Sequence, residues 1–370
     1  MNKFLYLQTN WLGTFDYNLR SDDYEYSNWF KISTLRLWPP HTYSRAHKLN
    51  TPWIADKSIC PIPEITHNET NFEKVFDSIA EEFCQLVAST GRTPYLCFSG
   101  GIDSTSILVA LLKVASPDLL SKLVILHDSR SVTENPYFFY KYIDKKLKTE
   151  NVDQFSITAD NYNKIIILDG EAGNQTMGHN AVQRLIFKER YDLLDKPWRE
   201  INDLTELFLN ATDFHINLVK ESIKYAPIPI ETGYDFLWWI NFNFKVDDVL
   251  LRKILPYTAN LDATQTKDFY YNSLYRFYAH PSMQIWSMLT KDYRRECLKI
   301  TPKYVPKKYI YDFDGNDLWF YNKREDTSSS HQLLANHVAY PLVAIDENWH
   351  KYSLADAESR IKLGQLLKRI

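Results

Sequence analysis

A glycine turn between a strand pattern and a helix pattern constrains the fold of this chain more than any other feature. Residues 95–98 (Tyr-Leu-Cys-Phe) form an apolar run that predicts a short buried strand. The chain turns at Gly100 and Gly101 and continues as an apolar helical pattern over residues 107–112. Glycines allow a tight turn, and the free N–H groups at the start of a helix favour negative charge. The stretch therefore predicts an anion-binding loop.

The side chains of this loop suit a phosphate that carries Mg²⁺. Ser99, Ser104 and Thr105 add hydroxyl donors, and Asp103 adds a carboxylate. The Walker spacing G-x-x-x-x-G-K-[ST] is absent. Residues 99–104 (Ser-Gly-Gly-Ile-Asp-Ser) instead resemble the pyrophosphate loop S-G-G-x-D-S of the N-type ATP pyrophosphatases. That superfamily includes asparagine synthetase, the β-lactam and lasso-peptide cyclases and several tRNA-modifying enzymes. The alternative is a purely structural turn.

A second motif follows another apolar strand pattern, at residues 164–168. Residues 169–180 (Asp-Gly-Glu-Ala-Gly-Asn-Gln-Thr-Met-Gly-His-Asn) are similar to the asparagine synthetase signature S-G-E-G-A-D-E-L-F-G-G-Y. A second strand-to-helix turn of this kind can face the first across one ligand. The resemblance implies that Glu171 orients or deprotonates an attacking amine. The residues it implies for the nucleotide are Ser99, Gly100, Gly101, Asp103, Ser104, Gly170 and, at the adenine, Leu126.

The chain departs from that family in the metal ligands and in the source of ammonia. The family's second metal-binding Asp is Asn174 here, followed by Gln175. An amide oxygen binds Mg²⁺ without a charge, so we expect Asp103 and Asn174 to form a weakened site. Asn2 takes the position of the family's glutaminase cysteine, and only about 70 residues precede the core. We therefore expect no glutaminase, and an acceptor that is free ammonia or an amine.

The family also uses a lysine late in the domain to stabilise developing negative charge. Asn322-Lys323-Arg324-Glu325 resembles the R-x-K-E context of that lysine. Lys307, which follows Pro306, is the competing placement. The sequence leaves Lys323 and Lys307 as alternatives.

The wider pattern predicts an α/β fold. A helical stripe over residues 71–90 precedes the first strand, and a second strand at residues 123–126 precedes a helical pattern at residues 136–148. Strands alternating with helices predict an open, mainly parallel sheet with its ligand at the carboxyl ends of the strands. The run at residues 155–158 is an edge strand or a loop, because residues 159–163 are too few for a parallel crossover.

The rest of the chain completes the expected architecture. Long aromatic patterns predict helices at residues 198–219, 234–255 and 269–298, and a capped helix over residues 353–370. Trp238, Trp239 and Phe242 are interpreted as core packing. We expect a small β-rich region at residues 1–68 and an asparagine synthetase-like domain at residues 69–370 with a helical C-terminal part. The resemblance implies the adenine nucleotide α-hydrolase-like fold for that domain.

The leading hypothesis is an enzyme that uses ATP and Mg²⁺ to adenylate a small carboxylate, releases pyrophosphate and forms an amide with ammonia or an amine. One alternative is adenylation of a nucleobase, as in the tRNA-modifying relatives. Thiolation there needs a placed nucleophilic cysteine, and Cys97 lies inside a strand. The other alternative is a non-catalytic scaffold that retains the fold.

Composition narrows the setting in which this chemistry is expected. A net charge of −3 gives no electrostatic reason to expect nucleic acid as a partner. The four cysteines form no C-x-x-C pair, which favours reduced thiols in a cytoplasmic protein. No window reaches the 18 apolar residues of a membrane-spanning helix, so we expect no membrane partner.

Overall fold

The computed structural model of the chain divides into two compact units. The sheet unit comprises residues 65–173 and 256–338, and the second unit comprises residues 1–64, 174–255 and 339–370. The residues that the structure describes are 3–7, 44–46, 55, 58–178, 182, 185–186, 189–204, 207, 213–323 and 342–353. Most of the predicted β-rich region lies outside these residues, and the predicted boundary after residue 68 stays a prediction.

Five parallel strands form the sheet of the sheet unit. They are β2 (Thr93–Cys97), β3 (Val124–His127), β4 (Lys148–Asn151), β5 (Ile165–Asp169) and β6 (Leu274–Arg276). Their order is β4-β3-β2-β5-β6, and every neighbouring pair is parallel. All five residues of β5 are buried, as expected for a strand covered on both faces. The predicted open parallel sheet with flanking helices is confirmed.

The strand order reverses beside β2. From β2 the chain moves to β3 and β4 on one side, and then returns to β5 and β6 on the other side. Leu96 of β2 pairs with Leu168 of β5, so the two strands end together. Ligands of open α/β sheets bind outside the carboxyl ends of strands at such a reversal. Both glycine motifs begin at this edge.

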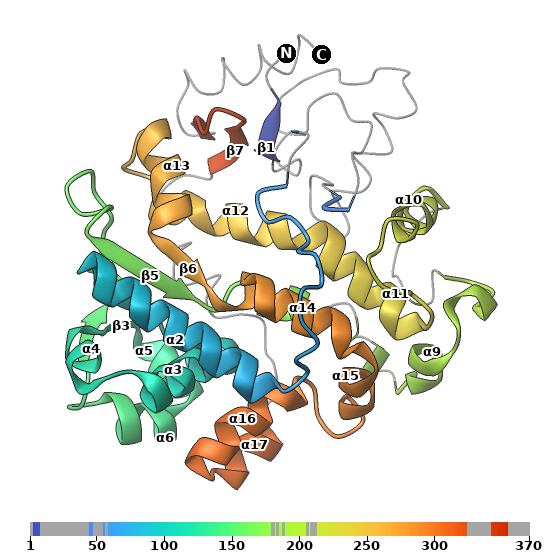
Figure 1. Ribbon diagram of the computed structural model, residues 1–370, viewed down its shortest axis with the longest axis horizontal. Helices are drawn as coiled ribbons and strands as arrows, with labels where there is room; N and C mark the ends of the chain where they lie inside the picture. Colours follow the sequence, from blue (N-terminus) through green and yellow to red (C-terminus); the bar gives the residue numbers. More distant parts are fainter. Residues whose placement is uncertain are drawn as a thin grey trace. The chain divides into compact units, whose positions relative to one another are not determined.

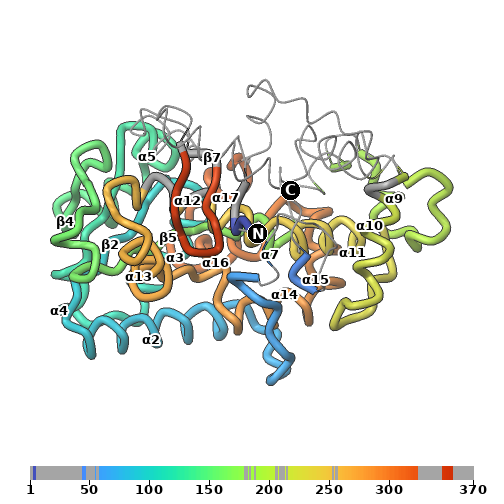
Figure 2. Tube along the Cα trace, turned by 90° about the horizontal axis from the view of Figure 1, so that it is seen from above, coloured from blue at the N-terminus to red at the C-terminus, as the bar shows by residue number. Residues whose placement is uncertain are grey.

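Helices cover the sheet where the sequence pattern predicts an apolar stripe. Helix α2 (Phe72–Thr90) begins after Asn71, whose Oδ1 accepts a hydrogen bond from Lys74 N at 3.0 Å, and it ends at Gly91 in the left-handed conformation. It lies over one face of the sheet in two perpendicular views (Figures 1 and 2). Helix α3 (Ile102–Val114) packs against α2 and α16 (Tyr304–Asp314). On β5, the side chains of Ile165 and Ile167 belong to an apolar cluster that also contains Phe269.

The remaining elements of the sheet unit are short. They are α4 (Pro117–Lys122), α5 (Ser129–Glu134), α6 (Pro136–Phe138), the π-helix η2 (Phe139–Ile143), α13 (Ala263–Asn272), the 3-10 helix η5 (Phe277–Ala279), α14 (Pro281–Leu289), α15 (Lys291–Cys297) and α17 (Asp317–Asn322). The predicted helical C-terminal part is therefore present.

Three predicted helices differ from the structure. The pattern at residues 136–148 stops being helical at Ile143, and Lys148 begins the edge strand β4, where pairing with β3 outweighs local propensity. The pattern at residues 269–298 is divided by β6, which pairs with β5. Within residues 198–219, only the 3-10 helix η3 (Trp198–Glu200) and the start of α10 (Asp213–Ile223) are helical among the described residues.

Two further expectations concern a loop and the chain end. Residues 155–158 form no strand, so the loop alternative is correct. Ser353 ends β8 (Lys351–Ser353), and residues 354–370 of the predicted terminal helix lie outside the described part of the chain.

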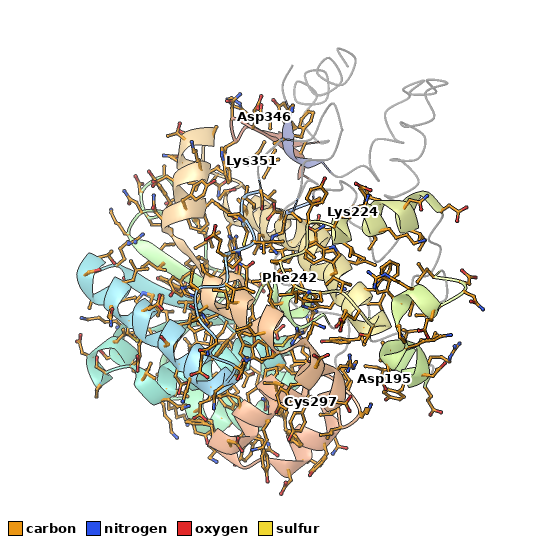
Figure 3. All side chains as sticks on the ribbon, turned by 45° about the vertical axis from the view of Figure 1, so that its right-hand side comes forward. Asp195, Lys224, Phe242, Cys297, Asp346 and Lys351 are labelled. Atoms are coloured by element: carbon orange, nitrogen blue, oxygen red, sulfur yellow. The ribbon has the colours of Figure 1, made fainter. Side chains whose placement is uncertain are left out.

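The second unit contains a small antiparallel sheet. Its strands are β1 (Phe4–Leu7), β7 (Leu342–Asp346) and β8, in the order β1-β7-β8. Asp346 is 1% exposed and accepts hydrogen bonds from Tyr352 Oη at 2.8 Å and from the backbone N of His350 at 3.0 Å. Figure 3 labels Asp346 and Lys351 at the two sides of this turn. The buried carboxylate holds the β7–β8 turn closed.

The helices of the second unit enclose an aromatic core. They include α7 (Gly173–Met177), which begins at the boundary between the units, and then α9 (Tyr191–Asp195), α11 (Gly233–Ile240), the π-helix η4 (Asn241–Lys245) and α12 (Val246–Tyr257). Trp238, Trp239 and Phe242 are fully buried, which confirms their interpretation as core. Within the described residues, no helix is both long and apolar enough to cross a membrane.

Candidate functional site

The glycine loop follows β2 and leads directly into α3. Gly100 has a φ of 72°, and a Cβ there would lie 2.3 Å from the carbonyl oxygen of Ser131. Only glycine fits such a position, because both the left-handed backbone and the close approach exclude a side chain. Gly101 is the N-cap of α3 and makes no side-chain cap hydrogen bond. The loop therefore presents a helix start of the kind that binds anions.

The loop hydroxyls hydrogen-bond within the loop. Ser99 Oγ and Ser104 Oγ lie 3.1 Å apart, and Ser104 Oγ also accepts a hydrogen bond from Ser99 N at 3.1 Å. Gly101 N donates to Ser99 Oγ at 3.3 Å. These hydrogen bonds connect the two ends of the loop through the hydroxyl groups of Ser99 and Ser104. A phosphate bound here would exchange them for stronger hydrogen bonds to an anion.

The structure brings the two motifs together at Asp103. A Cβ on Gly170 would lie 2.9 Å from Asp103 Cβ, and a Cβ on Gly173 would lie 2.5 Å from Asp103 Cγ. Ala172, between these glycines, has a φ of 67° and is 1% exposed. A buried non-glycine residue in this conformation is uncommon and is held by its surroundings. The second motif is therefore shaped to let the first-turn carboxylate of α3 approach its backbone.

Lys303, which sequence reasoning missed, binds Asp103. Lys303 Nζ lies 2.9 Å from Asp103 Oδ1 and 2.7 Å from Asp103 Oδ2. The Lys303 side chain is 2% exposed. The two residues are 200 positions apart, and nothing local in the sequence signals their contact.

The two lysines predicted from sequence lie in the same unit. Lys323 follows α17 and its ammonium pairs with the carboxylate of Glu134. A Cβ on Gly100 would lie 2.8 Å from Glu134 Cβ, so this pair lies directly beside the loop. Lys307 Nζ donates to Thr301 Oγ1 at 2.8 Å and to the carbonyl oxygen of Lys323 at 2.5 Å. Lys307 thus connects α16 to the end of α17.

The carboxyl end of β5 leads into Glu171, the residue predicted to orient or deprotonate the amine. Glu171 is partly buried, and its backbone N donates to Asp169 Oδ1 at 3.2 Å. Asp169 lies 3.7 Å from Arg276 Nε, and both side chains are less than a tenth exposed. Arg276 lies over the ring of Tyr270 at 4.9 Å. A buried ion pair therefore anchors the turn from which Glu171 projects.

The predicted adenine position lies at the end of β3. Leu126 is buried and its carbonyl oxygen accepts a hydrogen bond from Phe98 N at 2.9 Å, which ties β3 to the start of the loop. His127 packs its ring on Phe139 at 5.0 Å. His127 Nδ1 is buried and has no hydrogen-bond partner among the described residues.

Cys97 precedes the loop but is held inside the unit. Its Sγ lies 3.0 Å from Tyr257 Oη, and burial raises the pKa of the Tyr257 phenol well above its usual value. The tyrosine is therefore a neutral hydrogen-bond partner.

Asn174, the second predicted metal ligand, belongs to the second unit. Its Oδ1 is buried and has no hydrogen-bond partner among the described residues. Across the residues that the structure describes, no group of three or more His, Cys, Asp and Glu side chains is arranged to hold a metal ion. A metal site formed by Asp103 and Asn174 stays a prediction.

Comparisons with protein-family models, curated proteins and solved structures found no match to this chain.

Proposed function

We propose that the sheet unit binds ATP at the glycine loop and adenylates a carboxylate, as N-type ATP pyrophosphatases do. The observation that carries this proposal is the convergence of two glycine motifs on Asp103 at the carboxyl ends of β2 and β5. A structural turn needs no second motif against it. The finer fold assignment, that of the adenine nucleotide α-hydrolases, is part of the same proposal.

In the proposed adenylation step, the pyrophosphate part of ATP binds at the start of α3. A carboxylate oxygen of the substrate attacks the α-phosphorus, an acyl–phosphate bond forms, and the bond to the leaving pyrophosphate breaks. Charge develops on the leaving oxygens, where helix N–H groups and lysine ammonium groups stabilise it. Lys303 takes the role that sequence reasoning gave to Lys323 or Lys307, because its ammonium lies at the first turn of α3.

The second step transfers the acyl group to ammonia or an amine. The amine attacks the acyl carbon, AMP leaves, and the amine proton passes to a base. Glu171 is the proposed base because it follows β5 and stands in the motif that adjoins Asp103. His127 Nδ1 is buried and has no hydrogen-bond partner within the described part of the chain. This atom supports the placement of adenine at the end of β3, because a buried polar atom gains from a hydrogen bond to a ligand.

ATP binding by calorimetry tests the site. Ser104→Ala removes a hydroxyl at the start of α3, and hydrogen bonds to charged groups contribute roughly 1.5–3 kcal/mol. We expect ATP affinity to fall about ten- to a hundredfold. Ser121→Ala, an exposed serine of α4, is the matched control and should bind like the wild type.

Pyrophosphate exchange tests the reaction. Labelled pyrophosphate should enter ATP only when a carboxylate substrate is present, so a panel of small carboxylates is screened with the wild type. The protein can also bind ATP but show no exchange with any carboxylate. Exchange that then appears when tRNA is added would favour the tRNA-type alternative. Folded protein that binds no ATP would favour a retained scaffold.

A further inference from the structure

A buried lysine neutralises the carboxylate of the glycine loop. Both oxygens of Asp103 lie within 2.9 Å of the Lys303 ammonium. The Lys303 side chain is 2% exposed and the Asp103 side chain is 20% exposed. The cation is therefore buried, and its carboxylate partner is partly exposed. It is part of the folded unit and does not exchange with ions in solvent.

Two elements hold Lys303 in this place. Its backbone is left-handed, with a φ of 51°, which is uncommon for a residue with a side chain. Helix α16 begins at the next residue and packs against α3, the helix that carries Asp103. The fold thus delivers an ammonium group to the first turn of α3 through a conformation that the surrounding structure has to maintain.

The position of this ammonium is electrostatically unusual. The start of a helix carries a partial positive charge, so anions are favourable there and cations are not. A buried ion pair also contributes little to stability, because removing two charges from water offsets their attraction. A fold that needed only a packed contact would be served as well by apolar side chains. The pair is better explained by a ligand that requires positive charge at the loop.

The donor set at Asp103 does not fit a magnesium ion. Mg²⁺ takes six oxygen ligands at close to 2.0–2.1 Å, commonly with one or two carboxylates. Here both carboxylate oxygens already have Lys303 as partner. In the resembling family a second acid shares the metal, and the matching position in this sequence is Asn174. One carboxylate charge is lost and one protein cation is gained, which is the change expected when an ammonium replaces a divalent ion.

Building on the proposed ATP site, we propose that Lys303 takes the place of a metal ion held by Asp103. The pyrophosphate part of ATP then binds to the Lys303 ammonium and to the N–H groups of α3, without a metal bridge to the carboxylate. The ligand class is a polyphosphate, and the protein supplies its counter-cation. Lys323, whose ammonium lies at Glu134 beside Gly100, adds positive charge on the other side of the loop.

Calorimetry with inorganic pyrophosphate tests this proposal without requiring the substrate. Wild-type protein is titrated in excess EDTA and in excess MgCl₂. We expect binding in both buffers with affinities that differ by only a few-fold. Lys303→Met should weaken binding in EDTA by about tenfold or more, since a charge-assisted hydrogen bond is lost. Lys303→Arg, which keeps the charge, should retain part of the binding.

Two further variants complete the test. Lys308→Met removes an exposed lysine of α16 that pairs with Asp312, and it should bind like the wild type. Lys303→Met leaves the Asp103 carboxylate without its cation and can fail to fold. The double variant Lys303→Met with Asp103→Asn removes both charges, and it should fold and still bind weakly in EDTA.

Each outcome decides between the proposals. Wild-type binding that requires Mg²⁺ overturns the replacement of the metal, and so does unchanged binding by Lys303→Met or by the double variant in EDTA. Folded wild type that binds neither pyrophosphate nor ATP in either buffer removes the ATP site itself. Binding in EDTA that depends on Lys303 supports both proposals.

Discussion

Gly170 and Gly173 show how single residues set the distance between the two motifs. Each would place a Cβ within 3 Å of Asp103 if it carried a side chain. The motifs were recognisable in the sequence, because their residues are contiguous. The partner of Asp103 was not, because the contact with Lys303 spans 200 residues and depends on how α16 packs on α3. Contiguous sequence motifs therefore predict the glycine loop, whereas the lysine that pairs with Asp103 is determined by long-range packing of α16 against α3.

Gly173→Ala tests the contact between the motifs. The added methyl group would overlap the Asp103 carboxyl group, and overpacking of this kind costs roughly 1–3 kcal/mol. We expect a lower melting temperature and a loss of ATP affinity in the same variant. Gly315→Ala is the control, because Gly315 has a φ of 67° but no atom within 4 Å of its Cβ position. It should lose some stability and keep its ATP affinity. Equal ATP affinity in both variants would contradict the role of Gly173.

At the scale of elements, the site depends on α5, α16 and α17 as much as on the strands. Glu134 ends α5 beside Gly100, and Lys323 follows α17 to neutralise it. The ends of these short helices place charges around a loop that contains few charges of its own. The sequence patterns predicted α2, β2 and α3 because each has a continuous apolar run or stripe.

The elements that the sequence did not predict lie at the edges of the sheet. Strand β4 (Lys-Thr-Glu-Asn) has no apolar alternation, and it is a strand because it pairs with β3. Strand β6 has only three residues inside an aromatic pattern that also suits a helix. These edge strands form because they pair with a neighbouring strand. The spacing of apolar residues, which has a period of two in strands and 3.6 in helices, therefore does not predict them.

Lys323→Met tests the charge balance around the loop. The variant leaves the Glu134 carboxylate without its partner beside Gly100, where it repels a polyphosphate. At an effective dielectric constant near 20 and a separation of about 10 Å, that repulsion is roughly 1–2 kcal/mol. We expect ATP affinity to fall by about five- to thirtyfold. Adding Glu134→Gln should restore most of the loss, and a double variant as weak as Lys323→Met would contradict this explanation.

At the scale of the whole molecule, the proposed site and the predicted pH dependence of stability belong to different units. The glycine loop, Asp103, Lys303 and Glu171 all belong to the sheet unit, and the strand order that brings the motifs together is internal to it. The second unit contains its own buried carboxylate, Asp247, on α12. Its oxygens accept hydrogen bonds from the backbone N of Ile59 and of Cys60, each at 3.2 Å.

The buried Asp247 predicts a pH dependence of stability. Burial raises the pKa of this carboxyl group from 3.8 to about 6, so the folded protein favours the protonated form. The protonated Asp247 carboxyl group adds to the free energy of unfolding at pH values below its unfolded pKa. This contribution is lost as the pH rises through the folded pKa of about 6. The loss amounts to roughly 3 kcal/mol for the second unit.

Urea unfolding followed by tryptophan fluorescence measures this loss across pH 4 to 6. Asp247→Asn should flatten the dependence, because the amide does not titrate. Asp160→Asn, an exposed aspartate in a loop of the sheet unit, should keep the wild-type slope. A slope that is the same in wild type and Asp247→Asn would contradict the assignment.

The central claim is that the nucleotide phosphates bind at the start of α3. The most direct measurement is a crystal structure with a non-hydrolysable ATP analogue and Mg²⁺. We predict the phosphates on the N–H groups of Gly101 to Ser104, the Lys303 ammonium in contact with them, and the adenine beside Leu126. An analogue bound elsewhere, or an unchanged loop at saturating analogue, would contradict the account.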